Sequence, residues 1–460
     1  MFSYMNQGKQ FYKEVAMLAI PMVLQNMVTT SLGLLDSFMV GLLGEAPLAA
    51  VTMANTPVMV IMLMTFGLQS GGSVLMSQFY GKGDYDSINR VLGIGFYAAA
   101  GVTLLFGGVM FFLPVQFMGL FGNDAAVVAL AAKYGRIVAF SFFFDSITSV
   151  YVAAHRSMAN PKPGMVILMS SMVLNAFLNW VLIFGKLGAP AMGVEGAALA
   201  TLIARMVQLS MVIVHILFVD KKFHFQPGLA FRPGVDMLRR YVRYSLPVLF
   251  NETLWGLGSS LYPTIMGHMA SSQAILAAYG VSGNIERLCT VAIFGVSGAT
   301  SIIIGREIGA GADREKVLSV GKALDMLSVI VGAIVGGVFI AVTYLFFAPL
   351  VYPLFGLSPE ATEIATMMLV VTFSFLFFRA FNTTNVVGVI RGGGDVKTAA
   401  FIDLAPMWLV AIPTAALAGL VFQWGILAVY LCMALDNVVK ALLGVHRLRS
   451  GKWIRNLTVA

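Results

Sequence analysis

The sequence predicts an all-α polytopic membrane protein with twelve transmembrane helices in two pseudo-symmetric six-helix lobes. Three observations lead to this fold class: the composition, the recurrence of long apolar segments, and an internal repeat. Of the 460 residues, 59% are hydrophobic and 11% are charged, and the mean hydropathy is +0.87. Soluble proteins carry roughly 25% charged residues, so this composition excludes a soluble domain.

Apolar segments long enough to cross a hydrocarbon core of ~30 Å recur from end to end of the chain. We place the spans at 15–43, 48–80, 90–113, 125–155, 165–185, 192–218, 238–268, 275–308, 318–348, 360–390, 398–420 and 424–447. The first span is too long for a cleavable signal peptide, and no small-residue cleavage pattern follows it. We therefore expect it to remain as a transmembrane helix.

The basic residues predict the topology. If the N-terminus is cytoplasmic, most of the 29 Lys and Arg fall in cytoplasmic segments, including Arg156, the stretch 221–243 and the tail from Lys440. This distribution follows the positive-inside rule and predicts an inner or plasma membrane protein with both termini in the cytoplasm. The net charge of +8 therefore does not indicate a nucleic-acid partner. Cys289 and Cys432 lie in predicted spans and indicate neither a disulfide framework nor a metal site.

Four sequence matches in the same order indicate that one six-helix unit occurs twice. The matching pairs are "AIPMVLQN" (19–26) with "SLPVLFNE" (245–252), "FGLQSGGSVLMSQFYGKG" (66–83) with "FGVSGATSIIIGREIGAG" (294–311), "LFGND" (120–124) with "LFGLS" (354–358), and "HRSMANPKP" (155–163) with "IRGGGDVKT" (390–398). An even number of spans gives both units the same orientation, as in carriers that alternate access by rocking two lobes. We assign 1–225 to the N-terminal lobe with the start of a polar linker, and 226–460 to the C-terminal lobe.

The first predicted span carries a stripe of polar side chains. At ~100° per residue, Gln25, Thr29 and Asp36 lie on one side of this helix. A charge near the middle of a bilayer costs at least ~2.5 kcal/mol, so an intramembrane acid is by default a functional candidate. Asn175 and Asn179 likewise share one side of the fifth span. The alternatives are a structural ion pair or interhelical hydrogen bond for Asp36, and simple joining of helices for the two amides.

With Thr201 in the sixth span, the side chains of Asp36, Asn175 and Asn179 form a candidate cation site. Carboxylate, amide and hydroxyl oxygens are hard ligands that suit Na⁺, whereas the carboxylate alone suits H⁺. We expect no cofactor beyond this coupling ion. An enzyme is not expected, because no nucleophile with a base and no metal-ligand cluster is apparent, and His155 and His268 fall near opposite membrane faces.

The second predicted lobe has polar residues of its own. Glu252 lies in the seventh span with Tyr262 on the same face, and Arg379 and Asn382 form a polar pair in the tenth span. Other intramembrane charges are expected to stabilise packing or topology: Arg136, Asp145, Glu286, Arg287 and Asp403.

Taken together, the doubled lobe and the segments "LLDSFMVGLLG", "FGLQSGGSVLMSQFYGKGD", "HRSMANPKP" and "IRGGGDVKT" resemble the multidrug and toxic compound extrusion (MATE) family, nearest its bacterial NorM-like branch. The resemblance runs through nearly the whole chain. It implies an antiporter that exports amphipathic organic cations and drugs in exchange for Na⁺ or H⁺. We expect a monomer whose partners are these substrates and membrane lipid. The alternative is a flippase for a lipid-linked oligosaccharide or related amphiphile, which would favour a more cationic central cavity.

The resemblance carries over to particular residues. The family's first-span acid matches Asp36, and its fifth-span pair resembles Asn175 and Asn179, with Thr201 in a matching region of the sixth span. The seventh-span acid matches Glu252.

The family's tenth-span acid has no counterpart, because the segment "FFRAFNTTN" (377–385) offers Arg379 instead. We expect Arg379 to neutralise Glu252 in a charge-assisted pair, which would leave ion coupling to the first lobe alone. In the alternative, Arg379 points toward the headgroups and Glu252 takes a proton or binds the drug.

Overall fold

A computed structural model describes residues 3–122, 124–220 and 223–459, and within these ranges the chain forms helices and turns without a strand. Ten helices of the described chain are long and apolar enough to cross a membrane, and a pair bent by 51° makes an eleventh. The twelfth long helix is α9 (Val235–Gly267), whose first turns carry Asp236, Arg239, Arg240 and Arg243. These charges lower its hydropathy without shortening it.

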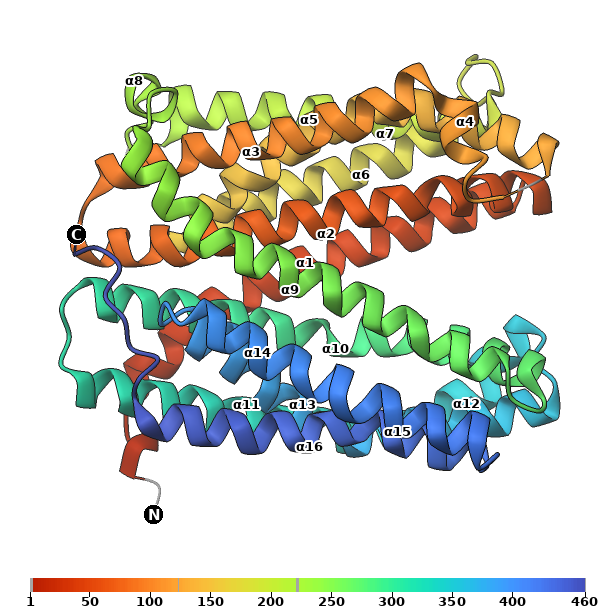
Figure 1. Cartoon of the computed structure of the whole chain (residues 1–460). Helices are drawn as coiled ribbons and strands as arrows, with labels where there is room; N and C mark the ends of the chain where they lie inside the picture. Colours follow the sequence, from red (N-terminus) through yellow and green to blue (C-terminus); the bar gives the residue numbers. More distant parts are fainter. Residues whose placement is uncertain (1–2, 123, 221–222, 460) are drawn as a thin grey trace. The chain divides into compact units, whose positions relative to one another are not determined.

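The first six long helices form the first lobe. They are α1 (Lys9–Gly41), α2 (Glu45–Lys82), α3 (Tyr85–Phe112), α5 (Ala125–Ser157), α6 (Lys162–Phe184), and α7 (Gly193–Val214) continued by the π-helical η2 (His215–Val219). Two short helices accompany them, α4 (Pro114–Met118) and α8 (Pro227–Ala230), whereas the short η1 (Ser3–Met5) packs against α11. Helix α5 packs against α2, α3 and α7, and α6 packs against α7 (Figure 1).

The second lobe continues from α9 with five further spans, some of which change helix type along their length. They are α10 (Ser272–Gly309), α11 with η3 (Arg314–Val342 and Thr343–Val351), α12 with α13 and η5 (Pro359–Ser374, Leu376–Thr383 and Thr384–Arg391), α14 with η6, α15 and η7 (Val396–Pro406, Met407–Ala411, Ile412–Ala416 and Leu417–Val421), and α16 (Ile426–Ser450), with the short η4 (Tyr352–Phe355) after η3. The predicted architecture of twelve spans in two lobes is confirmed, with each predicted boundary within a few residues of a helix end.

The first two long helices of each lobe have matching lengths. Helices α1 and α9 both contain 33 residues, and α2 and α10 both contain 38. Because helix length is set by where capping and turn residues occur, equal lengths in the same order indicate that the repeat extends to the ends of the helices.

The turns also repeat in detail. After α2 and after α10 the chain turns at a left-handed glycine, Gly83 with φ 77° and Gly311 with φ 76°. In the matching segments 155–163 and 390–398, the left-handed positions are Ala159 with φ 55° and Gly394 with φ 92°. A left-handed conformation is unfavourable for alanine, so its recurrence at the same place shows that the turn geometry is set by the surrounding fold.

The chain divides into two compact units, Leu24–Leu249 and Met1–Val23 with Phe250–Ala460, so the division falls inside α1 and α9 rather than in the linker. In the 24–249 unit, a Cβ on Gly67 of α2 would lie 2.7 Å from the Cα of Leu249. In the other unit, a Cβ on the equivalent Gly295 of α10 would lie 3.0 Å from the backbone nitrogen of Val23. Glycine thus permits the same close helix approach in both units.

The described part of the predicted linker folds back onto the first lobe. The backbone N–H of Gln226 donates to Asn89 Oδ1 at 2.9 Å. A Cβ on Gly93 of α3 would lie 1.7 Å from the carbonyl oxygen of Ala230, so α8 rests directly on the α3 backbone (Figure 1). Lys221 and Lys222, with which the predicted basic stretch begins, lie outside the described residues.

Candidate functional site

Helices α1, α6 and α7 bring the four side chains of the predicted first-lobe site together. Asn179 Nδ2 donates to Asp36 Oδ1 at 2.5 Å and to Asn175 Oδ1 at 3.1 Å. Asn175 Nδ2 donates in turn to Thr201 Oγ1 at 3.3 Å. The i, i+4 spacing of the two asparagines on α6 places both amides on the side of the helix that meets α1 and α7.

This cluster is buried, yet its hydrogen bonding is incomplete. Asn175 and Asn179 are 1% and 0% exposed. The buried Oδ1 of Asn179 has no hydrogen-bond partner among the described residues. A buried acceptor without a partner costs about 1–3 kcal/mol, and a cation held between this oxygen and the Asp36 carboxylate would remove that cost.

Within the described chain, no basic side chain lies at ion-pair distance from Asp36. Arg205, which follows Thr201 by one helical turn, is engaged elsewhere: its Nη1 lies 2.8 Å from Asp145 Oδ1 and donates to Gln208 Oε1 at 2.8 Å. Of the two alternatives for Asp36, the ion pair therefore has no partner, whereas the interhelical hydrogen bond to Asn179 is present.

Gln25 and Thr29 share a side of α1 with Asp36 but take part in other contacts. Gln25 Nε2 donates to the carbonyl oxygen of Pro161 at 2.7 Å, just before α6 begins. Thr29 Oγ1 donates back to the carbonyl oxygen of Gln25 at 3.0 Å. Gln25 therefore holds the start of α6 against α1, whereas the Thr29 hydrogen bond stays within α1 and Asn179, which contacts Asp36, lies near the other end of α6.

In the second lobe, the predicted pair between Glu252 and Arg379 is wrong. Glu252 Oε1 lies 3.0 Å from Arg391 Nη1, and Arg379 instead forms an ion pair with Glu286. Arg391 is 2% exposed, so the Glu252 pair is well shielded from water. The predicted neutralisation of Glu252 by an arginine is correct, but the arginine comes from the end of η5 rather than from α13.

A second ionic group joins α9, α14 and α16. Lys440 Nζ lies 3.2 Å from Asp403 Oδ1 and 3.0 Å from Asp436 Oδ2, and Asn251 Nδ2 donates to Asp403 Oδ2 at 3.0 Å. Together with the Glu286 and Asp145 pairs, this group supports the expectation that these further intramembrane charges stabilise packing.

The remaining predicted residues make local contacts. Arg136 lies over the ring of Phe111, with 4.9 Å between the guanidinium carbon and the ring centroid. Tyr262 packs in an apolar cluster with Met407 and Ala411. Asn382 Nδ2 donates to the carbonyl oxygen of Asn437 at 2.8 Å.

One buried acid was missed by the sequence analysis. Asp325 of α11 is 2% exposed, and its Oδ2 accepts a hydrogen bond from Asn385 Nδ2 at 2.7 Å. The rule that selected Asp36, an acid within a predicted span, applies equally to Asp325 in the span 318–348. Asp325 has Lys322 and Ser328 at i−3 and i+3 on its own helix, whereas its amide partner, Asn385, comes from η5.

The expectation that the chain has no metal-ligand cluster is also wrong. His155, His215 and Asp220 each offer a ligand atom, and these atoms lie within 4.8 Å of one another. Spacing along the sequence does not predict this group, because His155 lies in the last turn of α5 and the other two residues follow α7.

Known proteins resemble this chain along nearly its whole length. A family model described as MatE matches residues 21–181 and 247–417. The two matched segments fall one in each predicted lobe. The probable multidrug resistance protein NorM of Thermotoga maritima is 25% identical over 446 residues, which cover 96% of this chain and 93% of that protein.

Two solved structures share the fold. A variant of the Vibrio cholerae MATE transporter VcmN superposes with a TM-score of 0.85, at 21% identity, over 97% of this chain and 98% of that one. A MOP superfamily transporter from Pyrococcus furiosus gives a TM-score of 0.84, at 22% identity, over 95% of each chain.

Proposed function

The chain belongs to the MatE family of multi-pass membrane transporters, and from this premise we propose that it exports amphipathic organic cations and drugs in exchange for Na⁺ or H⁺ bound at Asp36. The names of its relatives, several of which are multidrug resistance proteins, support the substrate class. The family consists of transporters rather than enzymes.

The observation that carries the coupling proposal is the contrast between Asp36 and Glu252, which match the family's first-span and seventh-span acids. Glu252 has an arginine at 3.0 Å, whereas Asp36 accepts a hydrogen bond from the Asn179 amide and forms no ion pair within the described chain. A carboxylate without a fixed countercharge gains most from binding a mobile cation, because its desolvation is otherwise uncompensated. We therefore assign coupling to Asp36 rather than to Glu252.

A mechanism follows from this arrangement. Inward-moving Na⁺ or H⁺ neutralises Asp36, and for Na⁺ the orphaned oxygen of Asn179 supplies a second ligand at the same place. Neutralisation removes the charge that the Asn179 amide would otherwise stabilise, so the hydrogen bond between α1 and α6 weakens. Because α1 and α6 are packed helices, a change in this bond favours a different packing of the first lobe, which is the kind of step that alternating access requires.

The test uses purified protein in liposomes loaded with a fluorescent organic cation. Na⁺ and H⁺ gradients are imposed separately, and export is followed for the unmodified chain, for Asp36→Asn and for Glu45→Gln, an exposed acid of the same unit. We expect Asp36→Asn to abolish gradient-driven export in a folded protein, and Glu45→Gln to leave it unchanged. Full ion-coupled export by Asp36→Asn would refute the proposal.

The two ions are separated by a further variant. If Na⁺ drives export, Asn179→Ala should raise the Na⁺ concentration for half-maximal export by tenfold or more, since a ligand is lost. If export follows the proton gradient and is indifferent to Na⁺, Asp36 carries a proton and the amides serve only to position it.

No observation specifically favours the flippase alternative. Three basic side chains of the second-lobe spans are paired with acids: Arg379 with Glu286, Arg391 with Glu252, and Lys440 with Asp403 and Asp436. An anionic lipid-linked substrate would require cationic side chains that are not already neutralised in this way.

A further inference from the structure

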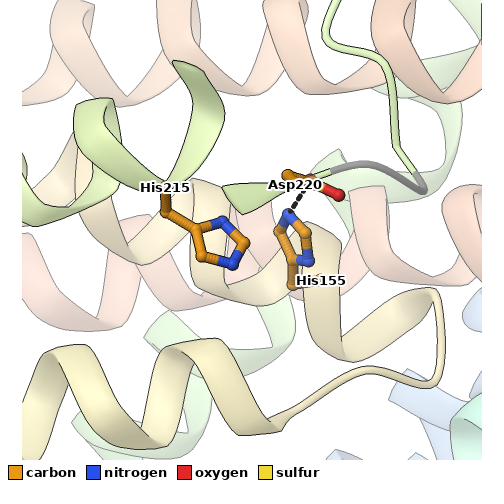
Figure 2. Close-up of side chains that lie close together, drawn as sticks. All are labelled: His155, His215 and Asp220. Atoms are coloured by element: carbon orange, nitrogen blue, oxygen red, sulfur yellow. Dashed lines mark ion pairs between the residues drawn. The ribbon is translucent and has the colours of Figure 1, made fainter. Parts of the chain in front are cut away.

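Three potential metal ligands converge where α5 ends and the linker begins. His155 lies in the last turn of α5, His215 opens η2, and Asp220 directly follows η2. Figure 2 shows the two imidazole rings and the carboxylate gathered in one place, from segments far apart in the sequence. All three belong to the 24–249 unit and none takes part in the proposed coupling site.

The spacing of the ligand atoms suits a small divalent ion. His155 Nε2 lies 3.1 Å from Asp220 Oδ2, and one ligand atom from each of the three residues lies within 4.8 Å of the others. Ligands 2.0–2.2 Å from a tetrahedral zinc ion are about 3.3 Å from one another. The 3.1 Å between His155 Nε2 and Asp220 Oδ2 is close to this value, and the ligand atom of His215 lies within 4.8 Å of both.

The burial of the first histidine points to a missing partner. His155 is 2% exposed, and neither of its ring nitrogens makes a hydrogen bond within the described part of the chain, although Nε2 faces the Asp220 carboxylate. A buried imidazole normally satisfies at least one nitrogen. A metal ion held by His155 Nε2 and the Asp220 carboxylate would give this nitrogen a bonded partner in place of the 3.1 Å ion-pair contact.

The second histidine is already oriented. Its Nδ1 lies 2.8 Å from the hydroxyl of Tyr151, one turn before His155 on α5. The same hydroxyl lies 3.5 Å from Asp220 Oδ2. A metal-binding histidine almost always uses its other nitrogen in such a bond, which fixes the ring and leaves the remaining nitrogen for the ion.

The repeat shows that the turn itself does not require a histidine. At the place equivalent to His155, the second lobe has Ile390. The turn is nevertheless the same, since Asn160 N–H donates to the His155 carbonyl at 2.9 Å and Asp395 N–H donates to the Ile390 carbonyl at 3.1 Å. The imidazole of His155 is therefore additional to what the backbone needs.

We propose that His155, His215 and Asp220 bind a divalent first-row transition-metal ion, for which Zn²⁺ is the best match. Two imidazoles favour Zn²⁺ and its neighbours over Ca²⁺ and Mg²⁺, which prefer all-oxygen sites. Three protein ligands leave a fourth position for water. The bound ion joins Asp220, where the linker begins, to the end of α5, and so fixes the start of the linker to the first lobe.

The site is tested by metal binding to the purified full-length chain in detergent, after removal of any polyhistidine tag. Zn²⁺ affinity is measured by competition with a chromophoric chelator, and Co²⁺ is used as a probe because its visible absorption reports tetrahedral coordination by nitrogen. The variants are His155→Gln, His215→Gln and Tyr151→Phe, and the control is His268→Gln, an exposed histidine outside the cluster.

We expect one ion per chain in the unmodified protein and in His268→Gln. Loss of either histidine ligand should weaken Zn²⁺ binding by about 100-fold or more, and Tyr151→Phe by about tenfold, because it removes only the orienting bond. Zn²⁺ should also raise the thermal unfolding temperature of the unmodified chain, and this rise should disappear in both ligand variants.

Absence of Zn²⁺ binding, or equal affinity in the unmodified chain and in both ligand variants, would overturn the proposal. If His155→Gln fails to fold because it alters a buried position, the half-buried His215→Gln gives the decisive comparison. None of these readouts depends on transport, so the result is independent of the proposed function.

Discussion

The ion pair between Glu252 and Arg391 offers a direct test of how the second lobe is held together. Glu252→Gln and Arg391→Met each remove one charge and leave the other without its partner. Arg391 is 2% exposed and Glu252 15% exposed, so the remaining charge stays out of water. Removing one partner of a buried pair costs about 3–5 kcal/mol, mainly because the uncompensated charge is poorly solvated.

The double variant separates the interaction between Glu252 and Arg391 from the contacts that each side chain makes with other residues. When both charges are gone, the penalty for an unpaired charge disappears, so the double variant should lose about 2–3 kcal/mol less than the sum of the two single losses. For a unit of about 200 residues, 1 kcal/mol corresponds to about 2–4 °C in the unfolding midpoint. Each single variant should therefore unfold about 6–20 °C below the unmodified protein.

The assay is thermal unfolding in one detergent at one scan rate, because unfolding of a membrane protein is in general irreversible. A matched cycle with Arg379→Gln is the control, since Arg379 pairs with Glu286 instead. In that cycle, the losses from Glu252→Gln and Arg379→Gln should add to within about 0.5 kcal/mol. Additive losses in the Arg391 cycle together with coupling in the Arg379 cycle would refute the pairing seen here.

Two further predictions concern side chains that are fully buried in the second lobe and the C-terminal tail. Trp453 is 0% exposed, and its Nε1 donates to the Leu448 carbonyl at 3.1 Å. Trp453→Ala should therefore lower the free energy of unfolding by about 3–5 kcal/mol. As a control, Trp424→Ala, at an exposed tryptophan, should leave the unfolding midpoint nearly unchanged. The Asp325 carboxylate is hydrogen-bonded to an amide and has no paired cation among the described residues. Asp325→Asn should therefore raise the unfolding midpoint at neutral pH, by the equivalent of about 1–3 kcal/mol. A lower midpoint would show that the negative charge is stabilised in a way that Asn385 alone does not explain.

The fold was predictable because its signals are long and repeated. Twelve apolar segments each carry many residues, so an error at one residue changes a boundary by little, and the left-handed turns at Gly83 and Gly311 mark helix ends in the sequence itself. The first-lobe site was predictable for a similar reason. Asn175 and Asn179 lie on one face of one helix, and a face can be derived from helical periodicity.

The second-lobe pairs were not predictable, because pairing depends on how several helices are rotated against one another. Arg379 was predicted to pair with Glu252 because it lies in the tenth span, where the resembling family has an acid. Arg391 lies just beyond the predicted span 360–390 and was counted among the cytoplasmic basic residues. In the structure this span bends by 51° after Ser374, and its last part, η5, is π-helical. Either change alters which face a later residue presents, so a straight α-helical projection fails beyond the bend.

The two lobes share turns at matching positions, but Asp36 and Glu252 differ in their partners, and this difference bears on the proposed coupling. In the second lobe a fixed guanidinium lies 3.0 Å from the Glu252 carboxylate, at the distance where a mobile cation would otherwise bind. A cation arriving there would have to displace a buried arginine and leave its charge unpaired, at a cost of several kcal/mol. In the first lobe, Asp36 has an amide donor and an unsatisfied amide oxygen nearby, so a cation meets no such cost. Under the proposed function, Asp36 is thus the coupling acid and Glu252 a structural acid of the same duplicated scaffold.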